Sequence, residues 1–417
     1  MQVPLHGIPT RANVSSRELF KTNLSAIPRL IWLVATACSL SGAAAQTASE
    51  SAAPIHASLI RVGPQHKLKT VAAAARVAKD GDIVEVESGE YPKDVAVWPQ
   101  SNLIIRGVGG RARLVAHGES AEGKAIWVIK GHNVIVENIE FVGARVPNRN
   151  GAGIRHEGGK LTVRRCLFEH NEMGVLTWND AAAELEIQAS EFRHNASGPT
   201  LGSLGHQIYA GSIRRFALHS SYVHHGAFGH LVKSRAAENH IYYNRLTDEM
   251  GRSSYELEFP NGGVAYVIGN IIQQSPRTEN PGVLSFGAEG YKSSRNELYF
   301  INNTVLNDLP DGGVVLAVSS GATIKAFNNL LRGSGQLEAV AAGEFVANYV
   351  AGAADVTLVG PYEYRLTKGS TLIGTAVDPG YVGTIQLRPD REYVHPLHTN
   401  AVNNVPYSPG ATQSLLP

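Results

Sequence analysis

Apolar residues recur along the chain in short strand-like runs, and each run is followed by polar or turn residues. The runs VIVENIEF, LTVRRCLF, LEIQASEF, FALHSSY, IYYNRL, VIGNII, FINNTV and KAFNNLL share one apolar position, which is occupied by Phe141, Phe168, Phe192, Tyr222, Leu246, Ile272, Val305 and Leu331. Successive members are 27, 24, 30, 24, 26, 33 and 26 residues apart. Because a single coil of this length cannot bury its own apolar face, the repeat predicts a solenoid of stacked β-coils.

A helical period precedes these repeats. Between residues 68 and 78 the apolar residues recur at helical spacing, and short strand-like runs punctuated by Asp-Gly and Ser-Gly begin at Ile83. This order of a helix, GDIVEVESGEY and LIIRGVGG resembles the N-terminal cap of right-handed parallel β-helix proteins of the pectate-lyase-like class. The resemblance covers residues 59–376. It implies an all-β, single-domain right-handed parallel β-helix solenoid with a short N-terminal capping helix.

The two ends of the chain differ from the repeats. In residues 1–45 four basic residues precede an apolar run that ends in three alanines, as in an export signal, so we expect cleavage near Gln46 and a periplasmic or secreted protein. The alternative is a lipid on Cys38. Residues 46–58 are interpreted as a linker, and residues 377–417, which lack strand periodicity, as an extended tail that packs on the solenoid. The mature chain keeps only Cys166, so we expect no intrachain disulfide.

Composition and charge limit the classes of partner. The chain has 37 Lys and Arg against 36 Asp and Glu, a formal charge of +1, which gives no electrostatic argument for binding nucleic acid or an anionic membrane. The apolar run of the signal is shorter than the roughly 20 residues that span a bilayer, so no transmembrane segment is expected. We expect a monomer whose partner is a polysaccharide.

A second position in the coils carries residues that differ from one coil to the next. In GHQIY, GHLVK and SYELE the residues Ile208, Val232 and Leu257 are predicted to face the core, which places Tyr209, Lys233 and Glu258 on the outer face about 4.8 Å apart. Arg235 shares that face. His206, His230 and Tyr255 either begin the strand where the chain bends outward or form an internal polar stack. Residues that repeat at one position, such as His170, His194 and His224, are interpreted instead as turn ladders.

These outer-face residues have the chemistry that β-elimination of a uronate polymer requires. The reaction needs a neutralised carboxylate, a base, and a proton donor for the leaving oxygen. His230 and Arg235 suit the first role. Lys233, beside a cation that favours the neutral amine, suits the second, with His206 as the alternative base. The proton donor is Tyr209 or Tyr255, and we place Glu256, Glu258 and Asn261 among the substrate-binding residues.

The lysine segment also resembles a narrower family. KSRAAENHIYYNRL followed by YELEFPNGG is similar to the Lys-Ser, Asn, Asn, Gly pattern of the alginate and chondroitin lyases built on a parallel β-helix. The resemblance implies that Lys233 is the base. Histidines replace the two glutamates that bind calcium in that family, and ELEFPNGG replaces its Arg-His-Gly segment. Since no acidic cluster has calcium-loop spacing, we predict no metal or other cofactor, and leave calcium as the open alternative.

Three classes of function remain. A lyase, or an epimerase that also abstracts a proton, accounts for the residues around Lys233. A non-catalytic glycan-binding or surface scaffold protein would use the exposed aromatic residues alone. A glycoside hydrolase needs two carboxylates on opposite sides of a sugar. Glu256 and Glu258 lie on one predicted strand, although Asp248 or Glu289 could complete a pair.

Overall fold

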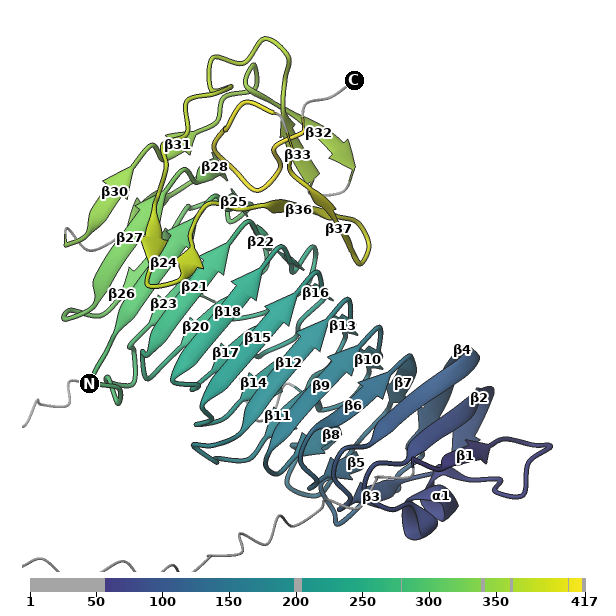
Figure 1. Cartoon of the computed structure of the whole chain (residues 1–417). Helices are drawn as coiled ribbons and strands as arrows, with labels where there is room; N and C mark the ends of the chain where they lie inside the picture. Colours follow the sequence, from purple (N-terminus) through teal and green to yellow (C-terminus); the bar gives the residue numbers. More distant parts are fainter. Residues whose placement is uncertain are drawn as a thin grey trace, which may run out of the picture. The chain divides into compact units, whose positions relative to one another are not determined.

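The computed structural model describes residues 57–198, 205–278, 280–338, 342–360, 363–403 and 405–414. These residues form a stack of coils in which each coil adds parallel strands to two sheets (Figure 1). The predicted export signal, residues 1–45, lies outside the described residues, as does most of the predicted linker. Within the described residues, no helix has the length and hydrophobicity needed to cross a membrane.

The ten-stranded sheet receives one strand from each coil. Its strands are β3 (Ala96–Trp98), β5 (Ala125–Ile129), β8 (Ala152–His156), β11 (Met173–Thr177), β14 (Ile208–Ala210), β17 (Val232–Ser234), β20 (Leu257–Phe259), β23 (Gly282–Phe286), β26 (Val314–Val318) and β29 (Gln336–Glu338). All its neighbouring strands run parallel, so each outer-face side chain lies directly above a side chain of the preceding coil.

The larger, 21-stranded sheet forms the remaining sides of the coils. Its strands are β1 (Leu59–Val62), β2 (Ile83–Pro92), β4 (Ile104–Val115), β6 (Val134–Glu137), β7 (Ile139–Val142), β9 (Lys160–Arg164), β10 (Leu167–Glu169), β12 (Glu184–Gln188), β13 (Glu191–Arg193), β15 (Arg215–His219), β16 (Tyr222–His224), β18 (Glu238–Tyr242), β19 (Arg245–Thr247), β21 (Val264–Ile268), β22 (Ile271–Gln274), β24 (Glu297–Ile301), β25 (Thr304–Asn307), β27 (Thr323–Phe327), β28 (Leu330–Gly333), β30 (Glu344–Val346) and β31 (Tyr349–Val350).

The predicted capping helix is present as α1 (Val71–Val77). The Oγ1 atom of Thr70 accepts a hydrogen bond from the Ala73 N–H at 3.1 Å, which caps the first turn. The carboxylate of Asp94 accepts from the first two N–H groups of the helix, at 2.5 and 2.8 Å. A side chain from the first coils therefore fixes the helix against the end of the stack.

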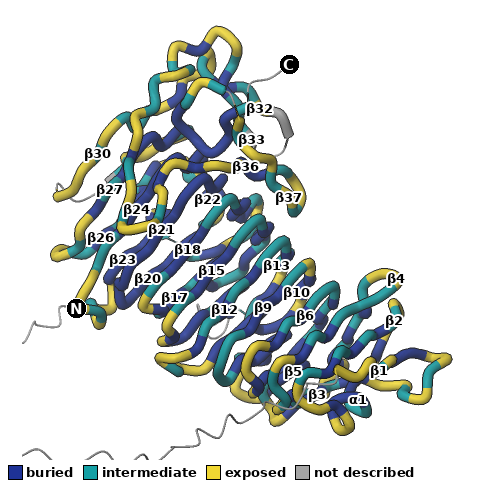
Figure 2. The backbone as a smooth tube through the Cα atoms, in the orientation of Figure 1, coloured by how far each residue is buried: buried dark blue, intermediate teal, exposed yellow. Residues whose placement is uncertain are grey.

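The core lies inside the coils, where the buried positions run as a continuous band (Figure 2). The rings of Phe141, Phe168 and Phe192 stack at centroid distances of 4.9 and 4.6 Å, in the predicted register. The next prediction was wrong by one residue, because Phe192 pairs with Val223 and not with Tyr222. Val223 is fully buried, whereas the neighbouring Tyr222 points out of the coil and stacks on His224 at 3.7 Å.

Polar ladders fill the turns. The buried Asn244, Asn270, Asn303 and Asn329 are linked in series, each Nδ2 donating to the Oδ1 of the next at 3.0, 3.0 and 3.1 Å. This satisfies amides that the core would otherwise leave unpaired. A histidine ladder is also present. Its third ring belongs to His225, 4.8 Å from His194, and not to the predicted His224.

The C-terminal segment leaves the parallel coils after β31 and forms short antiparallel hairpins. They pair β32 (Val356–Gly360) with β33 (Glu363–Leu366), β34 (Tyr381–Val382) with β35 (Ile385–Gln386), and β36 (Arg391–Val394) with β37 (His398–Ala401). Leu387 is fully buried against residues of β21 and β24, so the tail covers one side of the stack. The hairpins were not predicted, because strands of two to five residues are too short to show alternation.

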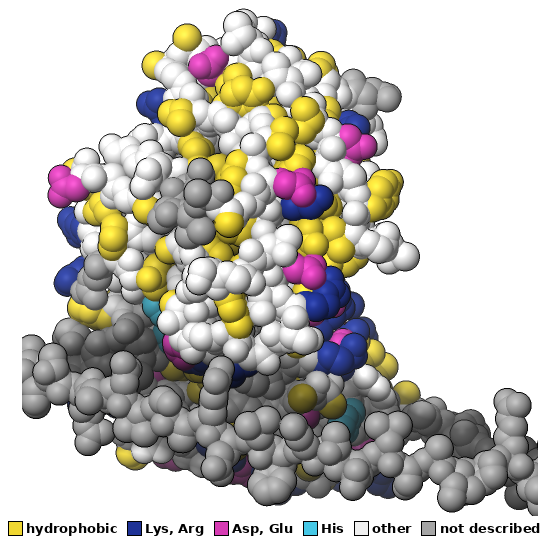
Figure 3. Space-filling view, turned by 90° about the vertical axis from the view of Figure 1, so that its left-hand side faces the viewer, with side chains coloured by type: hydrophobic (Ala, Val, Ile, Leu, Met, Phe, Trp, Pro, Cys, Tyr) yellow, Lys and Arg dark blue, Asp and Glu magenta, His cyan; other side chains and the backbone are white. Residues whose placement is uncertain are grey.

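Charges of both signs are interspersed on the surface. Figure 3 shows one face on which Lys and Arg side chains lie beside Asp and Glu side chains. This agrees with the formal charge of +1. Any attraction for a polyanion therefore has to come from a local group of cations.

Candidate functional site

The predicted outer-face residues lie in one column on the ten-stranded sheet. Tyr209 pairs in register with Lys233, and Lys233 with Glu258. The column continues backwards through Leu176 to Arg155. The residues that precede them in their strands face the core, as alternation along a strand requires.

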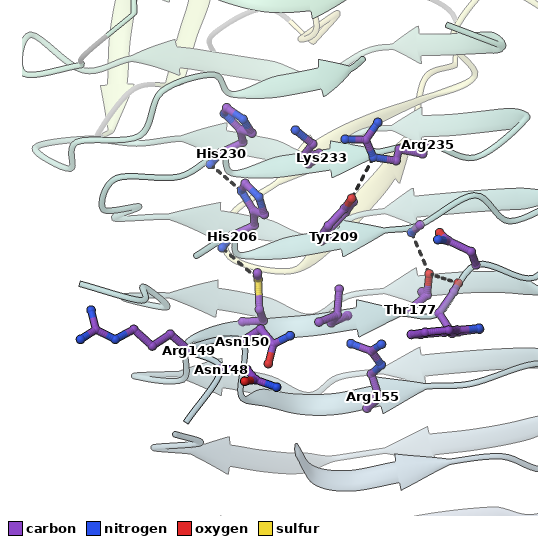
Figure 4. Close-up of a pocket in the computed structure, with 15 residues that line it drawn as sticks. Asn148, Arg149, Asn150, Arg155, Thr177, His206, Tyr209, His230, Lys233 and Arg235 are labelled. Carbon is purple, nitrogen blue, oxygen red and sulfur yellow. Dashed lines mark hydrogen bonds between the residues drawn. The ribbon is translucent and has the colours of Figure 1, made fainter. Parts of the chain in front are cut away.

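A groove of about 500 Å³ runs over this column (Figure 4). It is lined by Asn148, Arg149, Asn150, Arg155, Met173, Leu176, Thr177, Trp178, Asn179, His206, Tyr209, Gly211, His230, Lys233 and Arg235. None of these described lining residues is acidic, while four are Lys or Arg and two are His. The groove therefore gathers cations, of which Lys233 and Arg235 are paired with carboxylates that lie outside its lining.

His206 and His230 lie two residues before β14 and β17, and their largely buried rings form a polar stack that also borders the groove. Their rings stack at 4.9 Å. The Nδ1 atom of His206 accepts the backbone N–H of His230 at 3.0 Å, and Nδ1 of His230 accepts that of Tyr255 at 3.2 Å. In the neutral His206 ring the proton is therefore on Nε2. The Tyr255 ring packs against His230 at 5.3 Å, outside the groove lining.

This bonding makes His206 poorly suited to act as a base, because its lone pair already accepts a hydrogen bond. Burial, together with the nearby His230 and Lys233, lowers the pKa of His206 well below 6.5. The imidazole is therefore neutral at physiological pH and presents an N–H to its surroundings. Its geometry favours donation of a hydrogen bond over abstraction of a proton.

Lys233 lies between two carboxylates. Its Nζ atom is 2.7 Å from Oε2 of Glu258 and 3.2 Å from Oε1 of Glu289. Arg235 contacts the other oxygen of Glu289 at 2.7 Å. Arg235 is therefore not the only charge beside Lys233, because Glu289 binds both side chains.

Both of these carboxylates are ionised at neutral pH. Burial alone would raise the pKa of Glu258, but the contact with His230 and the ion pair with Lys233 outweigh it and lower the pKa from 4.5 to about 2. The hydrogen bond from Arg235 lowers the pKa of Glu289 below 4.5. Neither group can hold the proton that a general acid must supply.

Arg235 connects the column to the neighbouring turn. Its Nε donates to the Tyr209 hydroxyl at 2.8 Å, and a second nitrogen donates to Oδ1 of Asn261 at 2.5 Å. Because the phenol oxygen of Tyr209 accepts from a guanidinium, its own O–H remains available as a donor toward the groove. Tyr209 and Lys233 are thus adjacent groups that can exchange protons with a bound molecule.

Glu256 requires a correction, because it cannot contact a polysaccharide. Its side chain is 0% exposed, and its Oε1 atom accepts from the Ser253 hydroxyl at 3.3 Å. Burial and the nearby Asp248 raise the pKa of Glu256 well above 4.5. Glu256 lies just before β20, where the chain has not yet entered strand alternation, and it occupies the interior position that Leu231 fills one coil earlier. Asp248 is also fully buried, so neither residue can complete a surface carboxylate pair.

Comparison with known proteins gives matches among solved structures alone: no protein-family model and no curated protein matches the chain. Pectate lyase Pel9A matches with a TM-score of 0.57 and 13% identity, over 86% of this chain and 97% of that one. The fold is that of the pectate-lyase-like parallel β-helix. A pectin methylesterase from Aspergillus niger matches with a TM-score of 0.32 and 11% identity, over 71% of this chain and 90% of that one.

Sequence reasoning missed Arg155 and Trp178 in the groove of this β-helix. Arg155 belongs to the same column as Lys233, but the intervening gaps of 21 and 33 residues are too uneven for it to be aligned with the next three coils. The signal was present as a charged residue in GIRHE, at the position where β8 faces outward. An alignment of the coils that allowed loops of unequal length would have placed Arg155 at this outward-facing position.

A separate group of residues in the β-helix could hold a metal ion. Among the described residues, His224, His225 and Glu249 have ligand atoms within 4.8 Å of one another. The two histidines lie at the end of β16, Glu249 follows β19, and none of them lines the groove. Arg245 already pairs with Glu249 at 3.2 Å, and Nε2 of His224 is 3.3 Å from Glu191. The groove chemistry therefore has to be explained from its own side chains.

Proposed function

We propose that the protein is a polysaccharide lyase, or an epimerase that uses the same proton abstraction, acting on a uronate-containing polysaccharide. The observation that carries the proposal is the groove over Tyr209 and Lys233, whose described lining is basic and contains no carboxylate. An anionic polymer is the ligand that such a lining attracts. The parallel β-helix supplies a rigid surface on which these groups are held one coil apart.

The proposed reaction assigns one role to each group. Lys233 lies as an ammonium between Glu258 and Glu289, so it first releases a proton to solvent, and the resulting amine takes the proton from the carbon next to the uronate carboxylate. The electron pair of that C–H bond forms a carbon–carbon double bond as the adjacent C–O glycosidic bond breaks, and Tyr209 donates its proton to the leaving oxygen. In an epimerase a proton returns to the opposite face of the same carbon and no glycosidic bond breaks.

The protonation states of the carboxylates favour elimination over hydrolysis. Glu258 and Glu289 contact the same Lys233 ammonium, and a hydrolase would use a neighbouring pair of carboxylates of this kind. Hydrolysis, however, needs one carboxylic acid whose pKa is raised. Both carboxylates have lowered pKa values, and Glu256, whose pKa is raised, is enclosed in the core.

The test is to incubate the mature chain, beginning at Gln46, with a panel of uronate polymers. An increase in ultraviolet absorbance identifies the unsaturated product of elimination. New reducing ends without that absorbance identify hydrolysis, and solvent deuterium incorporated without cleavage identifies epimerisation. Binding with none of these changes identifies a non-catalytic protein.

We also propose that the reaction requires no metal, so addition of a chelator should leave the rate unchanged. A rate that the chelator abolishes and calcium restores would contradict the proposed metal independence.

A further inference from the structure

Arg155 is a buried cation that no carboxylate of the described residues contacts directly. Its side chain is 9% exposed, and in the described part of the chain it has no hydrogen bond or ion pair, with Nε buried and unpartnered. The residues before and after it in the column are the apolar Val128 and Leu176. Glu157, two positions along the chain, is bound to Lys124 at 2.7 Å. A guanidinium in such surroundings is costly unless an anion pairs with it.

An exposed aromatic ring, that of Trp178, lies next to the Arg155 guanidinium. The guanidinium carbon of Arg155 lies 5.3 Å from the centroid of the Trp178 ring. Although it is a large apolar residue, Trp178 is 57% exposed, beside the groove that both residues line. An exposed indole offers a flat face for the C–H groups of a sugar ring, and a guanidinium binds a carboxylate through two parallel hydrogen bonds.

We propose that Arg155 and Trp178 form a binding subsite for a uronate unit remote from the unit that reacts at Lys233. The indole packs against the sugar ring and the guanidinium pairs with its carboxylate. This inference rests on the proposed function in one respect, that the same acidic polymer extends from the subsite to Lys233. The substrate would then be a polysaccharide that carries carboxylates on sugar units away from the cleaved bond.

The register of the sheet sets the direction of the polymer. Arg155 and Lys233 are three coil steps apart in one column, through Leu176 and Tyr209. At one inter-strand spacing per coil the separation is about 14 Å. Figure 4 shows Arg155 and Lys233 on the same side of the sheet, with Tyr209 between them. This separation exceeds the width of one sugar ring, so the polymer runs along the axis of the stack and short fragments cannot reach both sites.

The experiment measures binding separately from catalysis. In a Lys233→Met background, which keeps the polymer intact, calorimetry compares polygalacturonate and alginate with methyl-esterified polygalacturonate. We expect Arg155→Gln to weaken binding of the better acidic polymer by about tenfold or more and to leave binding of the esterified polymer unchanged. Arg332→Gln is the matched control, because Arg332 also lies over an aromatic ring, Tyr364 at 5.7 Å, outside this groove.

Unchanged affinity of the Arg155→Gln protein for the acidic polymers overturns the proposal, as does a failure of both acidic polymers to bind the reference protein. If Arg155→Gln does not fold, Trp178→Ala replaces it, since that side chain is largely exposed, and we expect weaker binding of every polymer. The subsite and the proposed function fail separately. If Arg155→Gln weakens binding but the wild type forms no unsaturated product, the proposed lyase activity is contradicted and the subsite stands. If the wild type forms unsaturated product but Arg155→Gln binds the polymer normally, the subsite is contradicted and the lyase activity stands.

Discussion

The Nζ atom of Lys233 and the Oε2 atom of Glu258 are 2.7 Å apart on adjacent coils. Nε2 of His230 lies 3.0 Å from the same oxygen, so one carboxylate is held by two groups from the preceding coil. The lysine is therefore positioned by a carboxylate on strand β20 that a second side chain, His230, also holds. This arrangement leads to the first two predictions.

We expect Lys233→Met to reduce turnover by about a hundredfold or more, because positioned acid–base groups contribute that much. The same change should lower the free energy of unfolding by about 1–3 kcal/mol, since Glu258 is 5% exposed and loses its counter-ion. Initial rates and denaturant unfolding measure the two effects. Lys160→Met, which breaks an ion pair with Glu186 outside the groove, is the control and should keep full turnover. Full activity of the Lys233→Met enzyme would show that the lysine only holds the carboxylate.

Glu258 should make the protein less stable in acid. Its folded-state pKa of about 2 lies below the ordinary value of 4.5, so its contribution is complete above pH 4.5 and is lost as the pH falls toward 2. At about 1.4 kcal/mol per pKa unit the contribution is about 3 kcal/mol. Unfolding of the wild type and of Glu258→Gln, measured across this range, should give curves that converge in acid. A constant difference between the two curves contradicts the assignment.

Glu256 should have the opposite pH dependence. Its pKa is raised in the folded state, so ionisation favours unfolding, and the stability falls as the pH rises above 4.5 toward the folded-state value. Because glutamine resembles the protonated side chain, we expect Glu256→Gln to be more stable than the wild type at neutral and alkaline pH, with a gain that shrinks in acid. Thermal unfolding at several pH values checks this. A variant that is equally destabilised at every pH would indicate that the buried carboxyl is needed for its hydrogen bond to Ser253.

The aromatic stack should be a major source of stability. Phe168 is fully buried between Phe141 and Phe192, so Phe168→Ala should cost about 3–5 kcal/mol. Tyr381→Ala removes an aromatic ring that is 65% exposed and should change the stability by about 0.5 kcal/mol or less. Chemical denaturation of the two variants provides the comparison. Equal stabilities would refute the register of the coils.

The exported protein should begin at or near Gln46. The basic residues, apolar run and alanines of the first 45 residues predict cleavage there. N-terminal sequencing of the protein recovered from the periplasm or the medium provides the measurement. A chain that begins with a lipid-modified Cys38 would instead support the lipoprotein alternative.

The fold was predictable because the same short pattern of apolar residues recurs in every coil. Alternation within each strand was sufficient to place Tyr209, Lys233 and Glu258 in one column, and it failed where the chain was not yet a strand. Glu256 illustrates this failure, since it lies just before β20 and faces the core. Glu289 shows a second limit, because it reaches Lys233 from a loop 56 residues further along the chain, and no local pattern encodes that contact. Arg155 was missed because loops of unequal length hide the common position.

Because the strands pair in parallel register, the distance between Arg155 and Lys233 is a whole number of coil spacings. Each residue occupies one coil, and the coils of Leu176 and Tyr209 lie between them, so the distance can change only in steps of one whole coil. Loss or duplication of a coil would shorten or lengthen the reach of the groove by one inter-strand spacing while leaving both chemical environments as they are. The number of coils therefore sets the distance between the two sites. This distance can change during evolution without any change in the chemistry at either site.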